Sequence, residues 1–183
     1  GAALALAERL DTLAGLFGVG QQPTGDKDPF GLRRAALGVV RLLVEKQLPL
    51  SLPDLIGLAF AQFPQELGQA QTDLATFILE RLSGYLREAG YSAQQVDAVL
   101  ASRPSRLEEL PDILAAVKAF QQLPEAEALA AANKRIVNII RKAGREFSNA
   151  DRARLVEPAE QALHDTLARL RPGVEARFTA RDY

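Results

Sequence analysis

The 183-residue sequence contains no cysteine and only one histidine. Without cysteine the chain can form no disulfide, no thiolate nucleophile and no thiolate metal site. His164 is followed by Asp165, but this pair supplies at most two metal ligands, and no second imidazole completes a set. We therefore predict no metal site in this chain.

Methionine is also absent, even at position 1, so we expect the chain to be a piece of a longer reading frame. No apolar run approaches the roughly 18 residues that a membrane span needs. The N-terminus lacks the basic segment that leads into the apolar part of a signal peptide. The absence of cysteine is compatible with a reducing cytosol without proving one, and we expect a cytoplasmic protein with no membrane partner.

An excess of charge of one sign is missing as well. There are 22 Lys plus Arg against 23 Asp plus Glu, for a net charge of -1. A uniformly basic protein is excluded, so a nucleic-acid site must be a local cluster. Catalytic groups are also lacking, because no base partner is apparent for any hydroxyl nucleophile, and we predict no catalytic residue.

Helix-forming residues fill most of the sequence, and the alternation typical of strands is nearly absent. Leu6, Leu10, Leu13 and Phe17 make one apolar stripe on a first helix. Prolines and glycines set the expected limits of seven more helices, at about residues 28–46, 51–68, 72–90, 92–101, 107–123, 125–143 and 149–170. The sequence therefore predicts an all-α, multi-helix array.

The stretch PTGDKDPFGLRR, which begins at Pro23, has the glycines and the lysine of a phosphate-binding loop. Gly20 and Gly25 have the spacing of a P-loop, but Asp26 precedes Lys27 and no hydroxyl residue follows. A P-loop needs lysine and then serine or threonine directly after its second glycine. The stretch is therefore not a nucleotide loop.

Asp28 is expected to cap the helix that starts at this stretch, and Arg33 falls on that helix's apolar side. A buried guanidinium needs a carboxylate partner, for which the candidates are Asp11, Asp26 and Asp28. Two interpretations stay open. The stretch is either a structural clamp made by Asp26, Asp28 and Arg33, or a place of direct, secondary RNA contact through Lys27 and Arg34.

A one-sided basic helix is the sharpest feature of the sequence. At about 100° per residue, one third of the helix circumference contains the six residues Lys134, Arg135, Asn138, Arg141, Lys142 and Arg145. Between Lys134 and Arg154 seven basic residues face two acidic ones, a local excess of +5. A polyanion site, with RNA favoured, and a solvated or partner-facing helix are both open.

The stretch ALAERLDTLAGLFGVGQQPTGDKDPFGLRRAALGVVRLL resembles a block of the β subunit of the bacterial-type glycyl-tRNA synthetase, which is built from two α and two β chains. Four later stretches resemble successive blocks of the same subunit, in the same order: FILERLSGYLREAG, VDAVLA, LPEAEALAAANKRIVNIIRK and EPAEQAL. The resemblance covers essentially the whole chain.

The resemblance implies that the chain is a C-terminal portion of that subunit. Residues 1–69 would be the C-terminal part of an HD-like helical domain, 70–124 a helical connector, and 125–183 the incomplete N-terminal part of an anticodon-binding domain. The basic residues of KRIVNIIRKA match a helix of that last domain. Ala7-Glu8 stands where the family has Ala-Asp, and metal-dependent phosphohydrolase activity is not supported.

The resemblance also implies a function. Activation of glycine with ATP resides chiefly in the α subunit, while the β subunit helps to bind and position the tRNA. We therefore expect a non-catalytic, tRNA-binding part of a glycine-tRNA ligase, with no cofactor of its own, with tRNA(Gly) and the α subunit as partners, and no DNA. The alternative is a structural or subunit-interaction segment without direct tRNA contact.

Overall fold

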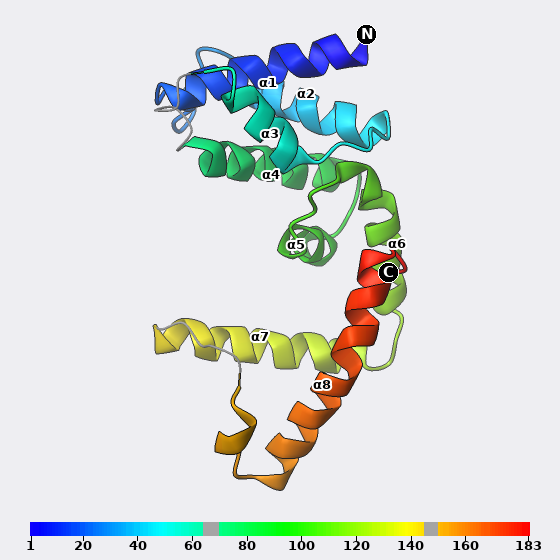
Figure 1. Cartoon of the computed structure of the whole chain (residues 1–183). Coiled ribbons are helices and arrows are strands. Elements are labelled where there is room, and N and C mark those ends of the chain that lie inside the picture. The colour runs from blue at the N-terminus through cyan, green and yellow to red at the C-terminus, as the bar shows by residue number, and fades with distance from the viewer. Residues whose placement is uncertain (64–69, 145–149) are drawn as a thin grey trace. The chain divides into compact units, whose positions relative to one another are not determined.

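The computed structural model describes residues 1–63, 70–144 and 150–183 (Figure 1). Within these ranges the chain is helical and contains no named strand, which confirms the all-α prediction. The α-helices are α1 (Ala2–Gly18), α2 (Leu32–Glu45), α3 (Leu52–Phe60), α4 (Gln71–Glu88), α5 (Ala93–Ala101), α6 (Leu110–Phe120), α7 (Ala126–Ala143) and α8 (Pro158–Thr179). No described helix has the length and apolar character that crossing a membrane would require.

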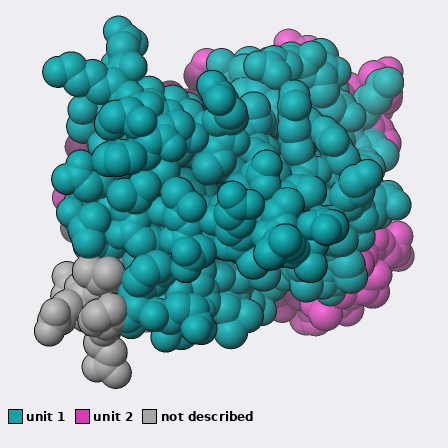
Figure 2. All heavy atoms as spheres, turned by 90° about the horizontal axis from the view of Figure 1, so that it is seen from above, with its two compact units in different colours: residues 1–118 teal, residues 119–183 magenta. Residues whose placement is uncertain are grey.

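The chain forms two compact units, Gly1–Lys118 and Ala119–Tyr183 (Figure 2). Unit 1 contains α1 to α5 and nearly all of α6, whereas unit 2 contains α7 and α8. In unit 1, α4 packs against α1, α2 and α3. The segments expected at residues 1–69 and 70–124 therefore lie mostly in one unit.

Unit 1 is built around a continuous apolar core. The predicted stripe of α1 is buried, since Leu6, Leu10, Leu13 and Phe17 are each at most 4% exposed. The facing residues of α4 recur every four positions and are also buried, namely Leu74, Ile78, Leu82 and Leu86. Each such side chain contributes about 1.5–3 kcal/mol through burial.

Most helix limits in unit 1 follow the predicted signals. Ser51 caps α3 by accepting the Asp54 N–H at 3.3 Å. Ser92 and Gln95 form a capping box at the start of α5. Gly90, with φ +90°, follows α4, as its predicted role as a helix terminator requires.

Two helix ends in unit 1 differ from the prediction. α3 ends at Phe60, before the expected residue 68, and the N–H of Phe63 turns back to the Phe60 carbonyl. Phe63 precedes Pro64, and a residue before proline is disfavoured in helical conformation. The helix expected at 107–123 is a 3-10 turn, η2 (Leu107–Glu109), followed by α6, which ends at Phe120.

The prediction for the last helix is wrong at both ends. α8 begins at Pro158, because Glu157 and Glu160 form a capping box and proline is favoured in the first turn. It also continues past Pro172 and Gly173 to Thr179. Proline removes only one backbone donor, and on a helix without buried residues water can satisfy the freed carbonyl.

Unit 2 exposes the apolar residues that its helices carry. Among its described residues only Ala126 is a buried hydrophobic residue. The apolar side of α7 is open, with Leu129, Ile136, Ile139 and Ile140 between 44% and 57% exposed. A stripe on α8 is exposed by 53% to 63%, comprising Leu163, Leu167, Leu170, Val174 and Phe178. The described part of unit 2 thus has no core like that of unit 1.

Candidate nucleic-acid interface

The basic face of α7 consists of Lys134, Arg135, Asn138, Arg141 and Lys142. Its many alanines, which are strong helix formers, favour α7, and Gly144 with φ +62° is its C-cap residue. The four cations are exposed and Asn138 is partly buried. Arg145, the sixth predicted residue, lies outside the described residues. One regular helix therefore presents five of the six residues on one side.

The cations of this basic face have no acidic partner in the described ranges. None of the four forms an ion pair there. Elsewhere arginines do, as in Arg106–Glu108 at 2.7 Å. Lys134 and Arg135 lie two helical turns before Arg141 and Lys142 on the same side of α7. The basic face is therefore a local concentration of positive charge that a bound polyanion would neutralise.

One polar contact organises the basic face. The Arg141 guanidinium donates a hydrogen bond from Nη2 to Asn138 Oδ1 at 2.8 Å. The spacing of three residues places the two side chains on adjacent turns of α7. Lys134, Arg135 and Lys142 lie in the same third of the helical projection as this pair. The sequence indicates that these residues share a face, but not that Asn138 and Arg141 are bonded.

The corner between α1 and α2 contains the predicted clamp residues. A tight turn joins Thr24 and Lys27, whose backbone groups are hydrogen-bonded in both directions at 2.9 and 3.2 Å. Gly25 allows this turn, with φ +52°. The Asp28 carboxylate then accepts the Leu32 N–H at 2.8 Å and the Arg33 N–H at 3.0 Å. Asp28 thus satisfies two of the donors that begin α2.

The details of this corner correct the expected geometry. α2 begins at Leu32 with Gly31 as its N-cap residue, not at Asp28. Asp28 reaches the helix across a turn that the Gly31 N–H closes on the Asp28 carbonyl at 3.2 Å. The partly buried Arg33 donates from Nη2 to the Gly25 carbonyl. Among the described residues Arg33 forms no ion pair with an aspartate, so the expected Arg–Asp pairing is wrong.

Asp26, Lys27 and Arg34 are all exposed. Arg34 lines a hollow of about 290 Å³ beside the start of α2, together with Glu8, Arg9 and Phe30. Acidic and basic side chains mix there, unlike on the basic face of α7. The clamp role of the corner and the secondary RNA contact of Lys27 and Arg34 both stay predictions.

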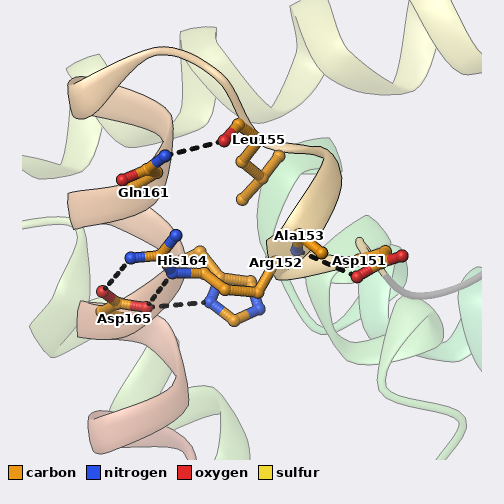
Figure 3. A network of polar contacts seen from close by, with 7 residues as sticks. All are labelled: Asp151, Arg152, Ala153, Leu155, Gln161, His164 and Asp165. Carbon is orange, nitrogen blue, oxygen red and sulfur yellow. Dashed lines mark hydrogen bonds and ion pairs between the residues drawn. The ribbon is translucent and has the colours of Figure 1, made fainter.

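A second polar network, which the sequence did not reveal, joins η3 (Arg152–Arg154) to α8 (Figure 3). Arg152 donates to both carboxylate oxygens of Asp165, from Nε at 2.8 Å and Nη2 at 3.1 Å. His164 Nδ1 lies 3.2 Å from Asp165 Oδ1. The hydrogen bond from Arg152 lowers the pKa of Asp165 to about 2. We call this contact the Arg152–Asp165 latch.

The latch residues do not form a metal site. The described residues include no group of three or more His, Asp or Glu side chains placed to hold a metal ion. Asp165 is instead engaged by a guanidinium, which competes for the same oxygens. Nearby, Gln161 donates to the Leu155 carbonyl at 2.8 Å. The arrangement fastens the segment before α8 onto that helix.

Comparison of the sequence with known proteins shows the family of the chain. The profile described as "Glycyl-tRNA synthetase beta subunit" matches residues 1–101. The chain belongs to the glycyl-tRNA synthetase beta subunit family. Relatives named "Glycine--tRNA ligase beta subunit" include those of Thiobacillus denitrificans, 56% identical over 185 residues, and Leptothrix cholodnii, 55% identical over 184 residues. A third, from Acidovorax sp. strain JS42, is 53% identical over 183 residues.

These matches span the whole chain, including α7, but only part of each relative. The alignments cover 100% of this chain and 26%, 26% and 25% of the three relatives. The chain therefore spans about a quarter of the length of its relatives in the glycyl-tRNA synthetase beta subunit family. Its expected C-terminal placement in the subunit is not confirmed and stays a prediction.

Proposed function

We propose that this chain is a tRNA-binding, non-catalytic part of a glycine-tRNA ligase β subunit, and that the basic face of α7 contacts the tRNA. The observation that carries the proposal is the set of exposed cations, Lys134, Arg135, Arg141 and Lys142, without acidic partners in the described ranges. Family membership supplies the kind of RNA, since the relatives are named as glycine-tRNA ligase subunits.

The physics of the basic face favours RNA over a protein carboxylate partner. The two pairs of cations lie two helical turns apart, about 10 Å along the axis, which is close to the distance over which charges act at 0.1 M salt. An RNA backbone offers several phosphates over such a distance, and neutralising them releases condensed counterions. One acidic side chain of a protein would neutralise only one of the four charges.

The remaining parts of the proposal follow from the resemblance. Glycine activation with ATP belongs to the α subunit, in an assembly of two α and two β chains in the cytoplasm. The chain would be a C-terminal portion of the β subunit, with HD-like (1–69), connector (70–124) and anticodon-binding (125–183) parts. Two observations support a change of module toward the end: the family profile ends at residue 101, and a new compact unit starts at Ala119.

The test is aminoacylation by the complete enzyme, assembled from α subunit and full-length β subunit. Replacing Lys134, Arg135, Arg141 and Lys142 with Gln removes four charges and keeps long, helix-forming side chains. We expect the KM for tRNA(Gly) to rise at least tenfold, because every phosphate that is no longer neutralised weakens binding. The KM values for glycine and ATP should stay unchanged.

A matched control variant removes the same number of positive charges at positions away from the basic face. Lys46, Arg87, Lys118 and Arg169 are exposed cations away from the basic face, and their joint replacement by Gln also removes four charges. This control should leave the KM for tRNA within about twofold, since net charge alone acts only through long-range steering. Equal effects of both variants would defeat the proposal.

The apolar stripe of α8 favours a second candidate function, that of a subunit-interaction segment. Five large apolar residues on one helix stay at least 53% exposed, and contiguous patches of this kind often mark protein contacts. Replacing Leu167 and Leu170 with Gln should then weaken co-purification of the α subunit. If those changes abolish assembly while the four-Gln variant aminoacylates normally, the second function is the better account.

A further inference from the structure

The contact between Asn138 and Arg141 fixes which way the asparagine amide is turned. A guanidinium carries five donors and no acceptor. The Asn138 atom that lies 2.8 Å from Arg141 Nη2 must therefore be the carbonyl oxygen Oδ1. Its amide nitrogen keeps two N–H donors that this bond does not use.

This orientation makes the basic face a donor surface. Lys134, Arg135, Arg141 and Lys142 have no acceptor atom in their side chains. Asn138 Oδ1, the only side-chain acceptor among the five residues, is engaged by Arg141. The five side chains therefore carry many donors and a single, already engaged acceptor, which suits an acceptor-rich ligand such as a phosphodiester backbone.

The same bond argues against reading of a base by Asn138. An asparagine that recognises adenine uses its oxygen for the base N6 amino group and its nitrogen for N7. Here the guanidinium already occupies one of the two lone pairs of that oxygen, so the oxygen would have to bridge the guanidinium and the base. A phosphate needs only donors, and an arginine plane recognises two of its oxygens at once.

On the basis of the proposed function, we propose that Asn138 and Arg141 form a phosphate clamp for the RNA backbone. Asn138 is a positioning residue that fixes the Arg141 guanidinium and adds its own N–H to the phosphate. Recognition by this pair is therefore independent of nucleotide sequence. The lysines and Arg135 around it supply longer-range attraction to neighbouring phosphates.

The test compares two RNAs, tRNA(Gly) and poly(U), on the full-length β subunit. Asn138→Ala removes the positioning hydrogen bond but no charge. Ordering one long side chain in advance is worth a factor of about two to ten in affinity. We expect that loss on both RNAs alike, with an unchanged slope of log K against log salt.

Two further variants separate charge from position. Arg141→Gln should reduce the salt slope by about 0.7 to 0.9, because one phosphate is no longer neutralised. Asn138→Asp keeps an acceptor for Arg141 but removes the amide donor and adds a negative charge, so it should weaken binding to both RNAs more than Asn138→Ala does. Circular dichroism should show unchanged helix content in each.

Three outcomes would overturn the clamp. Loss of affinity by Asn138→Ala on tRNA(Gly) alone would show base reading. Full affinity of Asn138→Ala on both RNAs, while the four-Gln variant binds poorly, would remove the positioning role and leave the proposed function standing. Wild-type affinity of the four-Gln variant for both RNAs would end the proposed function, and the clamp with it.

Discussion

Units 1 and 2 both contain amphipathic helices, but unit 1 buries their apolar stripes and the described part of unit 2 leaves them exposed. Leu82 on α4 is 0% exposed, whereas Leu167 on α8 is 53% exposed, although both belong to apolar stripes on long helices. In unit 1 four helices close around their stripes, and in the described part of unit 2 none does. An amphipathic sequence thus tells which residues share a face, but not what covers that face.

The difference assigns different sources of stability to the two units. Unit 1 rests on apolar burial, the largest favourable contribution to folding. The structure of unit 2 rests on local devices, such as the capping box of α8 and the Arg152–Asp165 latch, each of small value. The exposed faces of unit 2, basic on α7 and apolar on α7 and α8, are the surfaces that the proposed contacts would use.

The largest expected effect comes from emptying the core of unit 1. Leu82→Ala should lower the free energy of unfolding by about 3–5 kcal/mol, because it removes buried methyl groups and leaves a cavity. Leu167→Ala is the matched control in unit 2 and should cost less than about 1 kcal/mol. Urea denaturation followed by circular dichroism measures both. Similar losses would show that the α8 stripe is covered in solution.

A smaller effect is expected at the corner before α2. Asp28→Ala removes the acceptor for two backbone N–H groups and should destabilise unit 1 by about 0.5–2 kcal/mol, as loss of a helix cap does. The exposed Asp26 is the matched control, and Asp26→Ala should change stability by less than about 0.5 kcal/mol. Thermal melting of both variants decides whether Asp28 or Asp26 holds the corner.

The clamp prediction has its own variant in Arg33→Ala. Because Arg33 donates to one backbone carbonyl and not to a carboxylate, its loss should cost about 0.5–1.5 kcal/mol. Thermal melting beside Asp28→Ala measures it. A loss larger than that of Asp28→Ala would show that the guanidinium, not the cap, dominates the corner.

The smallest effect is the pH response of the latch in unit 2. The pKa of Asp165 is lowered from 3.8 to about 2 by its hydrogen bond with Arg152. A depressed folded-state pKa means that the stabilisation is fully present above pH 3.8 and is lost as the pH falls through about 2. Carboxyl carbon NMR of Asp165 should show this low midpoint, and Arg152→Gln should raise it toward 3.8. A wild-type midpoint near 3.8 would contradict the latch.

Sequence signals predict much of unit 1 and less of unit 2, for physical reasons. The stripe of Leu6 to Phe17 and the caps at Ser51 and Ser92 are local, so periodicity and residue type reveal them. The sequence does not predict that α8 continues past Pro172, because the free-energy cost of a proline in a helix depends on whether water can reach the backbone around it. Glu157 escapes prediction as a cap because it lies outside the usual capping residues.

In the candidate site, too, some features can be predicted from the sequence and others cannot. Helical periodicity places Lys134, Arg135, Asn138, Arg141 and Lys142 on one face of a predicted helix. The hydrogen bond from Arg141 to Asn138 depends on the rotamers of both side chains, which the sequence does not give. The Arg152–Asp165 pair joins residues 13 positions apart, on two different elements. Charge alone assigns Arg33 a carboxylate partner, whereas the nearby Gly25 carbonyl takes its hydrogen bond. Composition and spacing therefore predict which residues share a face, but they do not predict these hydrogen-bond partners, which depend on the three-dimensional structure.

In the function proposed above, unit 2 binds tRNA through the basic face of α7. The most direct measurement is the salt dependence of tRNA(Gly) binding by the full-length β subunit, wild type against the variant with Gln at positions 134, 135, 141 and 142. If three or four phosphates are no longer neutralised, the slope of log K against log salt should fall by roughly 2 to 4. Identical slopes and identical affinities for the two proteins would contradict the claim.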